Sequence, residues 1–141
     1  MTKKETIYNA LGMIEGAVCV SQKNTREVLM KAIQMIFANL PAAVNKDKEA
    51  IANMGLAQYI AGMGFSNVGL GIVHSMAHQL GAVYDTPHGI ANALLLPVVM
   101  EYNGEVCYER FREILTGLGC DVRADSKDEV IAKFVEKIKE L

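Results

Sequence analysis

All three histidines of this chain lie within a stretch of fifteen residues, at His74, His78 and His88. His74 and His78 are four residues apart, a spacing that places two side chains on one face of an α-helix, one turn apart. His88 follows the short segment 84–87, whose Thr86-Pro87 pair can fold the chain back toward them. Three neutral imidazoles that converge in this way favour a divalent metal such as iron, zinc or copper.

The competing interpretation is that these histidines are core side chains, hydrogen-bonded within the fold. A pair of histidines one turn apart also arises by chance. Ser75 stands where the zinc motif H-E-x-x-H has its glutamate, so that motif is absent. Spacing alone leaves both interpretations open.

Charged residues are distributed unevenly along the chain. Between Ala50 and Met100 the only formally charged residue is Asp85, whereas both ends are rich in Lys and Glu. A helix exposed to water normally carries a charged face. The middle third is therefore expected to be buried nearly all round or covered by something else. The formal net charge of −2 gives no electrostatic reason to expect nucleic acid or an anionic membrane as a partner.

Localisation is inferred from cysteine usage and apolar runs. Cys19, Cys107 and Cys120 are widely spaced and form no C-x-x-C pair, which predicts free thiols. Glu15 interrupts the only N-terminal segment that could serve as a signal peptide. No stretch is expected to reach the length of a membrane span, because the richest run, 93–100, is short and contains Pro97. We therefore expect a soluble cytoplasmic protein.

Apolar residues at three-to-four spacing predict an all-α fold, with residues 1–141 forming a single helical domain. Seven helices are predicted. The first has apolar positions Ile7, Leu11, Ile14 and Val18, the second has a cap at Asn24 or Thr25 and an end at Pro41, and the third and fourth span about 47 to 62–64 and about 68–83. The fifth has Thr86 as N-cap and Pro87 as first residue, the sixth spans about 105–118, and a Ser126–Glu129 capping box precedes the last. Glycines at 69, 71 and 81 weaken a helix, so we expect them to mark the close approach of another backbone or a ligand.

A long ordered motif carries a family resemblance. It runs through Gly62-Met63-Gly64-Phe65-Ser66-Asn67-Val68-Gly69-Leu70-Gly71, His74, Ala77-His78, Leu80-Gly81-Ala82, Thr86-Pro87-His88-Gly89 and Ala91-Asn92. This motif resembles the hallmark of the group III, iron-dependent alcohol dehydrogenases, and above all their lactaldehyde reductase and propanediol oxidoreductase branch. The resemblance is strong over 54–103, detectable in the first forty residues and thin after Cys107.

The resemblance implies an oxidoreductase built from two domains. In that family a Rossmann-like first domain holds NAD(P), a helical second domain holds iron or sometimes zinc, and the alcohol lies in the cleft between them. Carried over, His74 and His88 match two of the four metal ligands. His78 matches a catalytic, non-ligand histidine that lines the cleft, and Phe65 falls beside the substrate pocket. The metal would act as a Lewis acid toward an alkoxide during hydride transfer.

The sequence departs from the family at its front end. The family's remaining ligands are an Asp and a His one turn apart, and the alignment places Tyr8 and Gly12 at those positions. Neither Asp nor His occurs before Asp47, and Glu5 and Glu15 are poor substitutes because Glu15 points to a different angle of its helix. The chain also shows no glycine-rich strand–turn–helix that could bind a dinucleotide.

Two functional expectations follow from these residues. The first is the metal-binding part of an NAD(P)-linked alcohol dehydrogenase that requires a separately supplied cofactor domain and is inactive alone. The second is a non-enzymatic, self-associating helical module that binds metal weakly at most. Because the uncharged stretch 50–100 would remain partly uncovered, we expect a homo-oligomer joined through the fourth helix or the neighbourhood of Phe65 and 94–96.

Overall fold

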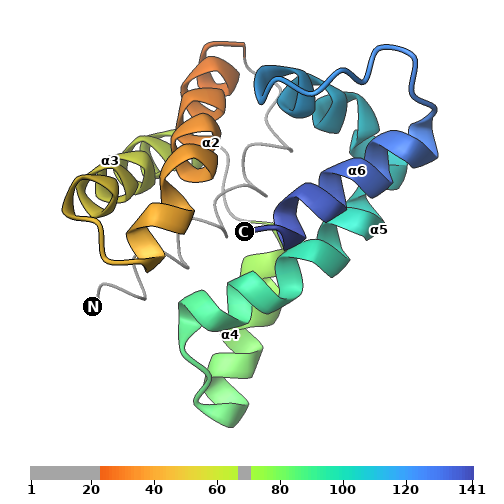
Figure 1. Cartoon of the computed structure of the whole chain (residues 1–141). Coiled ribbons are helices and arrows are strands. Elements are labelled where there is room, and N and C mark those ends of the chain that lie inside the picture. Colours follow the sequence, from red (N-terminus) through yellow and green to blue (C-terminus); the bar gives the residue numbers. More distant parts are fainter. Residues whose placement is uncertain (1–22, 67–70) are drawn as a thin grey trace.

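The computed structural model describes residues 23–66 and 71–141. Its helices are α2 (Lys23–Val44), α3 (Lys48–Phe65), α4 (Ile72–Tyr84), α5 (His88–Gly117) and α6 (Lys127–Lys139) (Figure 1). No strand occurs among the described residues, and the prediction of an all-α fold is confirmed. The predicted first helix, Cys19 and the positions of Tyr8 and Gly12 lie outside the described residues.

α2 and α3 pack along each other as one pair (Figure 1). Apolar residues at three-to-four spacing on α2 meet small and flexible residues of α3, and both rows are almost fully buried: Leu29, Ile33, Ile36 and Leu40 on α2, and Met54, Ala57 and Ala61 on α3. A Cβ at Gly64 would overlap the Leu29 side chain, so this glycine lets the helices approach closely. Asp47 caps α3 by accepting a 2.8 Å hydrogen bond from the Ala50 N–H, and the expected third helix is confirmed.

Two sequence predictions for α2, its N-terminal cap and its end, are wrong. The helix begins at Lys23, so Asn24 and Thr25 lie inside its first turn. Pro41 lies inside α2 and does not end it; only one hydrogen bond is lost there, and burial of Leu40 and Ala43 keeps the last turn in place.

The expectation about membrane spans also needs correction. Residues 26–44 of α2 are long and apolar enough to cross a membrane by length and composition, with a mean hydropathy of 1.3. A core helix satisfies the same criteria, and the buried row of α2 against α3 is core packing of that kind.

α5 is the longest helix, with 30 residues, and it contacts α4, α6 and α2. α6 lies beside its middle portion, α4 lies near its start, and α2 meets its C-terminal end (Figure 1). At that end Gln34 donates a 2.8 Å hydrogen bond to the Gly117 carbonyl. Phe111 of α5 and Phe134 of α6 stack with their ring centroids 4.1 Å apart, both fully buried.

The bounds of α4 and α5 differ from the sequence prediction. α4 begins at Ile72, after Gly71 as N-cap, and not near 68. The predicted fifth and sixth helices are one continuous helix from His88 with Pro97 inside it, and Pro87 is its N-cap and not its first residue. Pro97 removes few backbone hydrogen bonds from the helix. The burial of Leu96, Val99 and Met100 outweighs that loss, so the helix continues unbroken.

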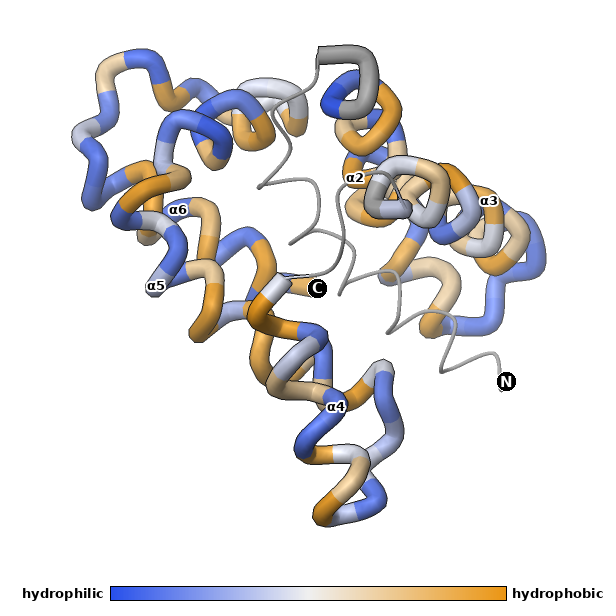
Figure 2. Tube along the Cα trace, turned by 180° about the vertical axis from the view of Figure 1, so that it is seen from behind, coloured by the Kyte–Doolittle hydropathy of each residue, from blue (hydrophilic) through white to orange (hydrophobic). Residues whose placement is uncertain are grey.

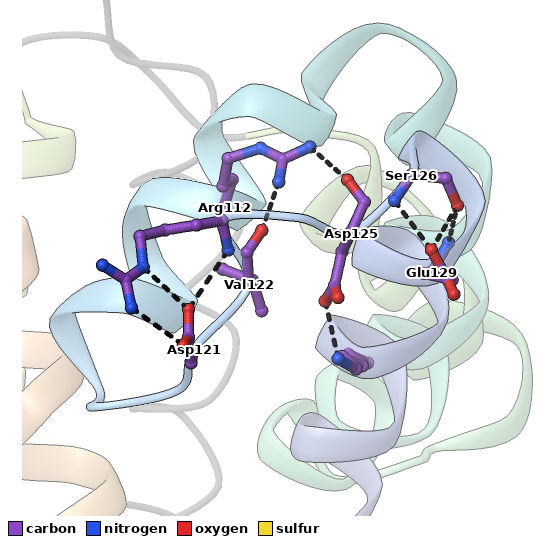
Figure 3. A network of polar contacts seen from close by, with 8 residues as sticks. Arg112, Asp121, Val122, Asp125, Ser126 and Glu129 are labelled. Atoms are coloured by element: carbon purple, nitrogen blue, oxygen red, sulfur yellow. Dashed lines mark hydrogen bonds and ion pairs between the residues drawn. The ribbon is translucent and has the colours of Figure 1, made fainter.

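α6 begins at the predicted capping box, which is confirmed. The Ser126 N–H and hydroxyl each lie 2.7 Å from a Glu129 carboxylate oxygen, and the Glu129 N–H donates to the Ser126 hydroxyl at 3.4 Å. Arg112 of α5 ties down the preceding connection by donating to the carbonyls of Val122 and Asp125 (Figure 3). That connection mixes hydrophilic and hydrophobic residues (Figure 2), and Val122 within it is buried. α5 and α6 are therefore joined by a loop with its own polar contacts.

Candidate functional site

Two of the three histidines lie on α4, and the third lies at the start of α5. α4 carries His74 and His78 one turn apart. It stops at Tyr84 because Asp85 adopts a left-handed conformation, φ 54°, and its N–H closes on the Gly81 carbonyl at 3.1 Å. Thr86 and Pro87 then reverse the chain, and His88 is the first residue of α5.

The turn brings the His88 ring beside both α4 histidines. The His88 centroid lies 5.4 Å from that of His74 and 5.2 Å from that of His78, with the His78 and His88 planes 25° apart. The His74 and His78 centroids are 6.4 Å apart. His74 is buried, with 6% of its surface exposed, whereas His78 and His88 are exposed. The cluster therefore has a buried end and an end that opens to solvent.

Burial and the neighbouring rings favour the neutral form of His74 and His88. Burial, followed by the nearby His88 and His78 rings, lowers the pKa of His74 to about 4. Burial and then His78 also lower the pKa of His88. At neutral pH both rings therefore keep a nitrogen lone pair, which is the form that binds metals.

One polar residue of the site was not singled out from the sequence. Asn92 lies one turn after His88 on α5, and its amide Nδ2 is 3.0 Å from His88 Nε2. Asn92 and His74 are the two polar side chains that are buried among the described residues. The i,i+4 spacing from His88 was the signal available, since it places both side chains on one helix face.

The described residues supply part of a metal-ligand set. The neutral imidazoles of His74 and His88 are suitable donors, yet no group of three or more His, Cys, Asp or Glu side chains with metal-binding geometry occurs in the described part of the chain. Glu5 and Glu15 lie outside the described residues, as does the side chain of Phe65. Cys107 and Cys120 are free thiols far along the chain from the histidines.

The uncharged stretch is not buried all round. Large apolar side chains along its three helices are exposed: Leu56, Tyr59 and Met63 on α3, Ile72, Met76, Val83 and Tyr84 on α4, and Ile90, Leu94 and Val98 on α5. Of the proposed contact region 94–96, Leu94 is 67% exposed, but Leu96 belongs to the chain's own core. The expectation of burial nearly all round is therefore wrong for these helices, and the alternative, that something else covers this stretch, stays a prediction.

Of the three glycines expected to mark a close approach, Gly81 does not, and tighter contacts occur at other glycines. A Cβ at Gly81 would lie at an ordinary 3.5 Å from the Thr86 carbonyl, whereas Cβ atoms at Gly104 and Gly117 would lie 2.7 Å from Ile131 and from the Met30 sulfur. Gly69 lies outside the described residues. Together with Gly64 against Leu29, these tight contacts join α5 to α6, α5 to α2 and α3 to α2, away from the histidines.

A groove of about 530 Å³ lies between α5 and α6. Acidic and apolar side chains, with one lysine, line it: Glu101, Glu105, Asp128, Ile131, Ala132, Val135, Glu136 and Lys139. None of the three histidines lines it, so the groove and the histidine cluster are separate features.

Comparison with known proteins agrees with the fold and the motif. The family model for the C-terminal part of the Fe-containing alcohol dehydrogenases matches residues 13–141. The match continues past Cys107, where the sequence resemblance was thin. This helical chain with its histidine cluster belongs to the Fe-containing alcohol dehydrogenase family.

Individual relatives of this chain include lactaldehyde, butanol and propanediol enzymes. The chain is 51% identical to lactaldehyde reductase of Escherichia coli K12 over 109 residues, which is 77% of this chain and 28% of that enzyme. It is 41% identical over 117 residues to NADPH-dependent butanol dehydrogenase of Clostridium saccharobutylicum, covering 83% of this chain and 30% of the enzyme. A crystal structure of 1,3-propanediol oxidoreductase superposes with a TM-score of 0.88 at 37% identity, over 96% of this chain and 37% of that one. The chain thus spans between 28% and 37% of the length of these relatives.

Proposed function

We propose that this chain supplies the metal-binding helical part of an NAD(P)-linked alcohol dehydrogenase that interconverts alcohols and aldehydes. The observation that carries the proposal is the convergence of His74, His78 and His88, with neighbouring ring centroids 5.2–6.4 Å apart, at the junction of α4 and α5. The lactaldehyde, butanol and propanediol enzymes among its relatives support this class of reaction. The cofactor NAD(P) would be held by a separately supplied domain.

His74 and His88 would hold the metal, Fe²⁺ or Zn²⁺, through neutral imidazole nitrogens. A metal at that position supplies Lewis acidity toward an alcohol or aldehyde oxygen. His78 stacks on His88 on the exposed side of the cluster, where it can face a substrate and exchange a proton with it. Phe65 is proposed to line the same pocket.

A chimaera tests the proposed reaction. Residues 13–141 of this chain replace the corresponding segment of E. coli lactaldehyde reductase, which keeps its own residues at the positions of Tyr8 and Gly12. NAD-dependent alcohol oxidation is then followed by absorbance. We expect measurable turnover that His88→Ala abolishes and Tyr102→Ala, on an exposed site of α5, leaves intact. An inactive but folded chimaera contradicts the proposal.

Metal binding by the chain alone is expected to be weak. Two neutral imidazoles leave the charge of a divalent cation uncompensated and much of its coordination to water. Titration with Zn²⁺ or Fe²⁺ is expected to show an affinity weaker than micromolar, and no NAD-dependent alcohol oxidation is expected without a cofactor domain. Stoichiometric submicromolar binding would show that further ligands take part.

We also propose that the chain self-associates in the cytoplasm, as a non-enzymatic alternative or as part of the enzyme. The exposed apolar residues of α4 and the first half of α5 favour this, because monomers rarely leave such patches open. Sedimentation at tens of micromolar is expected to show a dimer or larger species that Leu94→Glu shifts toward monomer. Lys31→Glu on the exposed face of α2 is the matched charge control. A monodisperse monomer of the unmodified chain would contradict the proposal.

A further inference from the structure

Asn92 occupies a position that the fold alone does not explain. Its side chain is 0% exposed on α5. Its Oδ1 has no hydrogen-bond partner among the described residues, and its one described side-chain contact is the 3.0 Å approach of Nδ2 to His88 Nε2. A buried polar atom without a partner destabilises a fold, and asparagine is a poor helix former. An apolar residue of similar size would serve packing better, so the amide is tied to His88.

His88 needs such a partner because of where it lies. It is the first residue of α5, and its side chain is exposed. The rings packed near it belong to His74 and His78, and both are imidazoles that can themselves turn. A neutral imidazole carries its proton on either ring nitrogen, and its hydrogen bonds decide which.

An amide can satisfy either state of the ring. The NH₂ group donates to a nitrogen lone pair, and after a rotation of the amide the carbonyl oxygen accepts from a ring N–H. Either arrangement selects one tautomer and fixes the plane of the ring. Partners of this kind on metal-binding histidines change metal affinity by about 10–100-fold.

We propose that Asn92 is a positioning residue for His88: its amide holds the plane of the imidazole and selects which ring nitrogen carries the proton. The benefit to a metal rests on the function proposed above, but the contact itself is a property of the metal-free chain. Asn92 does not touch the reacting atoms. It acts through His88.

Imidazole ¹⁵N NMR of the metal-free chain tests the positioning role directly. In the unmodified chain we expect His88 to show one protonated and one lone-pair nitrogen, the pattern of a single tautomer. Asn92→Leu should replace this with averaged signals. Asn92→Asp keeps the shape and can accept from a ring N–H, so it should restore a single tautomer with the proton on Nε2.

Asn53→Leu is the matched control, because Asn53 of α3 is a half-buried amide that donates a 3.0 Å hydrogen bond to Asn39, away from the histidines. This variant should leave the His88 signals unchanged. Circular dichroism establishes that each variant is folded, and Asn92→Asp keeps the test decisive if Asn92→Leu is not. A His88 spectrum that is the same in Asn92→Leu and the unmodified chain, or averaged in Asn92→Asp, overturns the proposal.

Zn²⁺ titration of the same variants separates this inference from the proposed function. We expect the dissociation constant to rise about 10-fold or more in Asn92→Leu and to be unchanged in Asn53→Leu. A tautomer that is fixed by Asn92 in a chain that binds no Zn²⁺ would support the positioning role and reject the metal function. Zn²⁺ binding of equal strength in all variants, with unchanged His88 signals, would reject the positioning role alone.

Discussion

The two halves of α5 differ in the charged residues on and around their surfaces. The C-terminal half and α6 carry charges that pair with one another: Lys127 with Glu105 at 2.6 Å, Lys133 with Asp125 at 2.6 Å, and Arg110 with Glu113 at 2.9 Å. The N-terminal half, 88–100, has no charged residue, and α4 beside it has none either. α6 begins with a capping box, whereas Gly71 caps α4 without a side-chain hydrogen bond.

This difference separates a region whose surface charges pair with one another from a region whose surface exposes apolar side chains. Surface ion pairs of this kind add little stability, but their charged side chains are typical of a solvent-exposed surface. The uncharged region instead exposes apolar side chains and contains both buried polar residues of the described chain, His74 and Asn92. The proposed metal site and the proposed self-association surface therefore lie together around α4 and the start of α5.

The largest expected effect comes from the aromatic core of the region with paired charges. Phe134→Ala removes one ring of the fully buried Phe111–Phe134 stack and should lower the free energy of unfolding by about 3–5 kcal/mol. Leu94→Ala, in the exposed region, should change it by less than about 0.5 kcal/mol in the monomer. Urea denaturation of both variants measures the contrast. Equal losses would mean that the two regions fold with similar dependence on their apolar residues.

Acid should weaken the histidine region selectively. The folded chain holds the pKa of His74 at about 4, below its ordinary value of 6.5, so the unfolded chain binds a proton there first as the pH falls. The stability from neutral His74 is complete above pH 6.5 and is lost as the pH falls toward 4, by at most about 3 kcal/mol. Denaturation between pH 7.5 and 4.5 with a chelator should show this slope, reduced in His74→Gln and largely kept in His78→Gln. An identical slope in His74→Gln would assign the effect to other groups.

Two glycines sharpen the comparison at the level of packing. A Cβ at Gly104 would lie 2.7 Å from Ile131 Cγ1, whereas nothing lies within 4 Å of a Cβ at Gly55 on α3. Gly104→Ala should therefore destabilise by about 1–3 kcal/mol, while Gly55→Ala should stabilise by about 1 kcal/mol through helix propensity. Thermal unfolding of the pair reports both signs. Stabilisation by Gly104→Ala would show that α6 can shift to admit the methyl group.

The smallest expected effects concern helix starts. Ser126→Ala removes the side-chain cap of α6 and should cost about 1 kcal/mol. Gly71→Ser at α4, where the backbone is extended at φ −100°, should add about a few tenths of a kcal/mol, because serine caps slightly better than glycine. Chemical denaturation measures both changes. A larger gain at Gly71 than loss at Ser126 would reverse the ranking of the two caps.

Sequence patterns predicted the elements whose signals are local. The capping box at Ser126 and Glu129, the α3 cap at Asp47 and the i,i+4 pair His74–His78 depend on neighbouring residues, and each forms as its spacing indicates. Proline was misread at Pro41 and Pro97, because its local cost is smaller than the burial gained by continuing α2 and α5. Asn92 belongs to the quoted motif, but its contact with His88 was not predicted because the motif carries no information on side-chain partners.

The sequence by itself determined that the chain is helical, that its charges avoid the middle third, and that its histidines lie on two consecutive helices. These follow from periodicity and residue type, which act over a few neighbouring positions. Only the tertiary structure decided that His88 returns to within 5.4 Å of the His74 ring centroid, that α5 is one helix, and which apolar residues stay exposed. Each of these depends on contacts between residues far apart in the chain, whose free energies no local pattern contains.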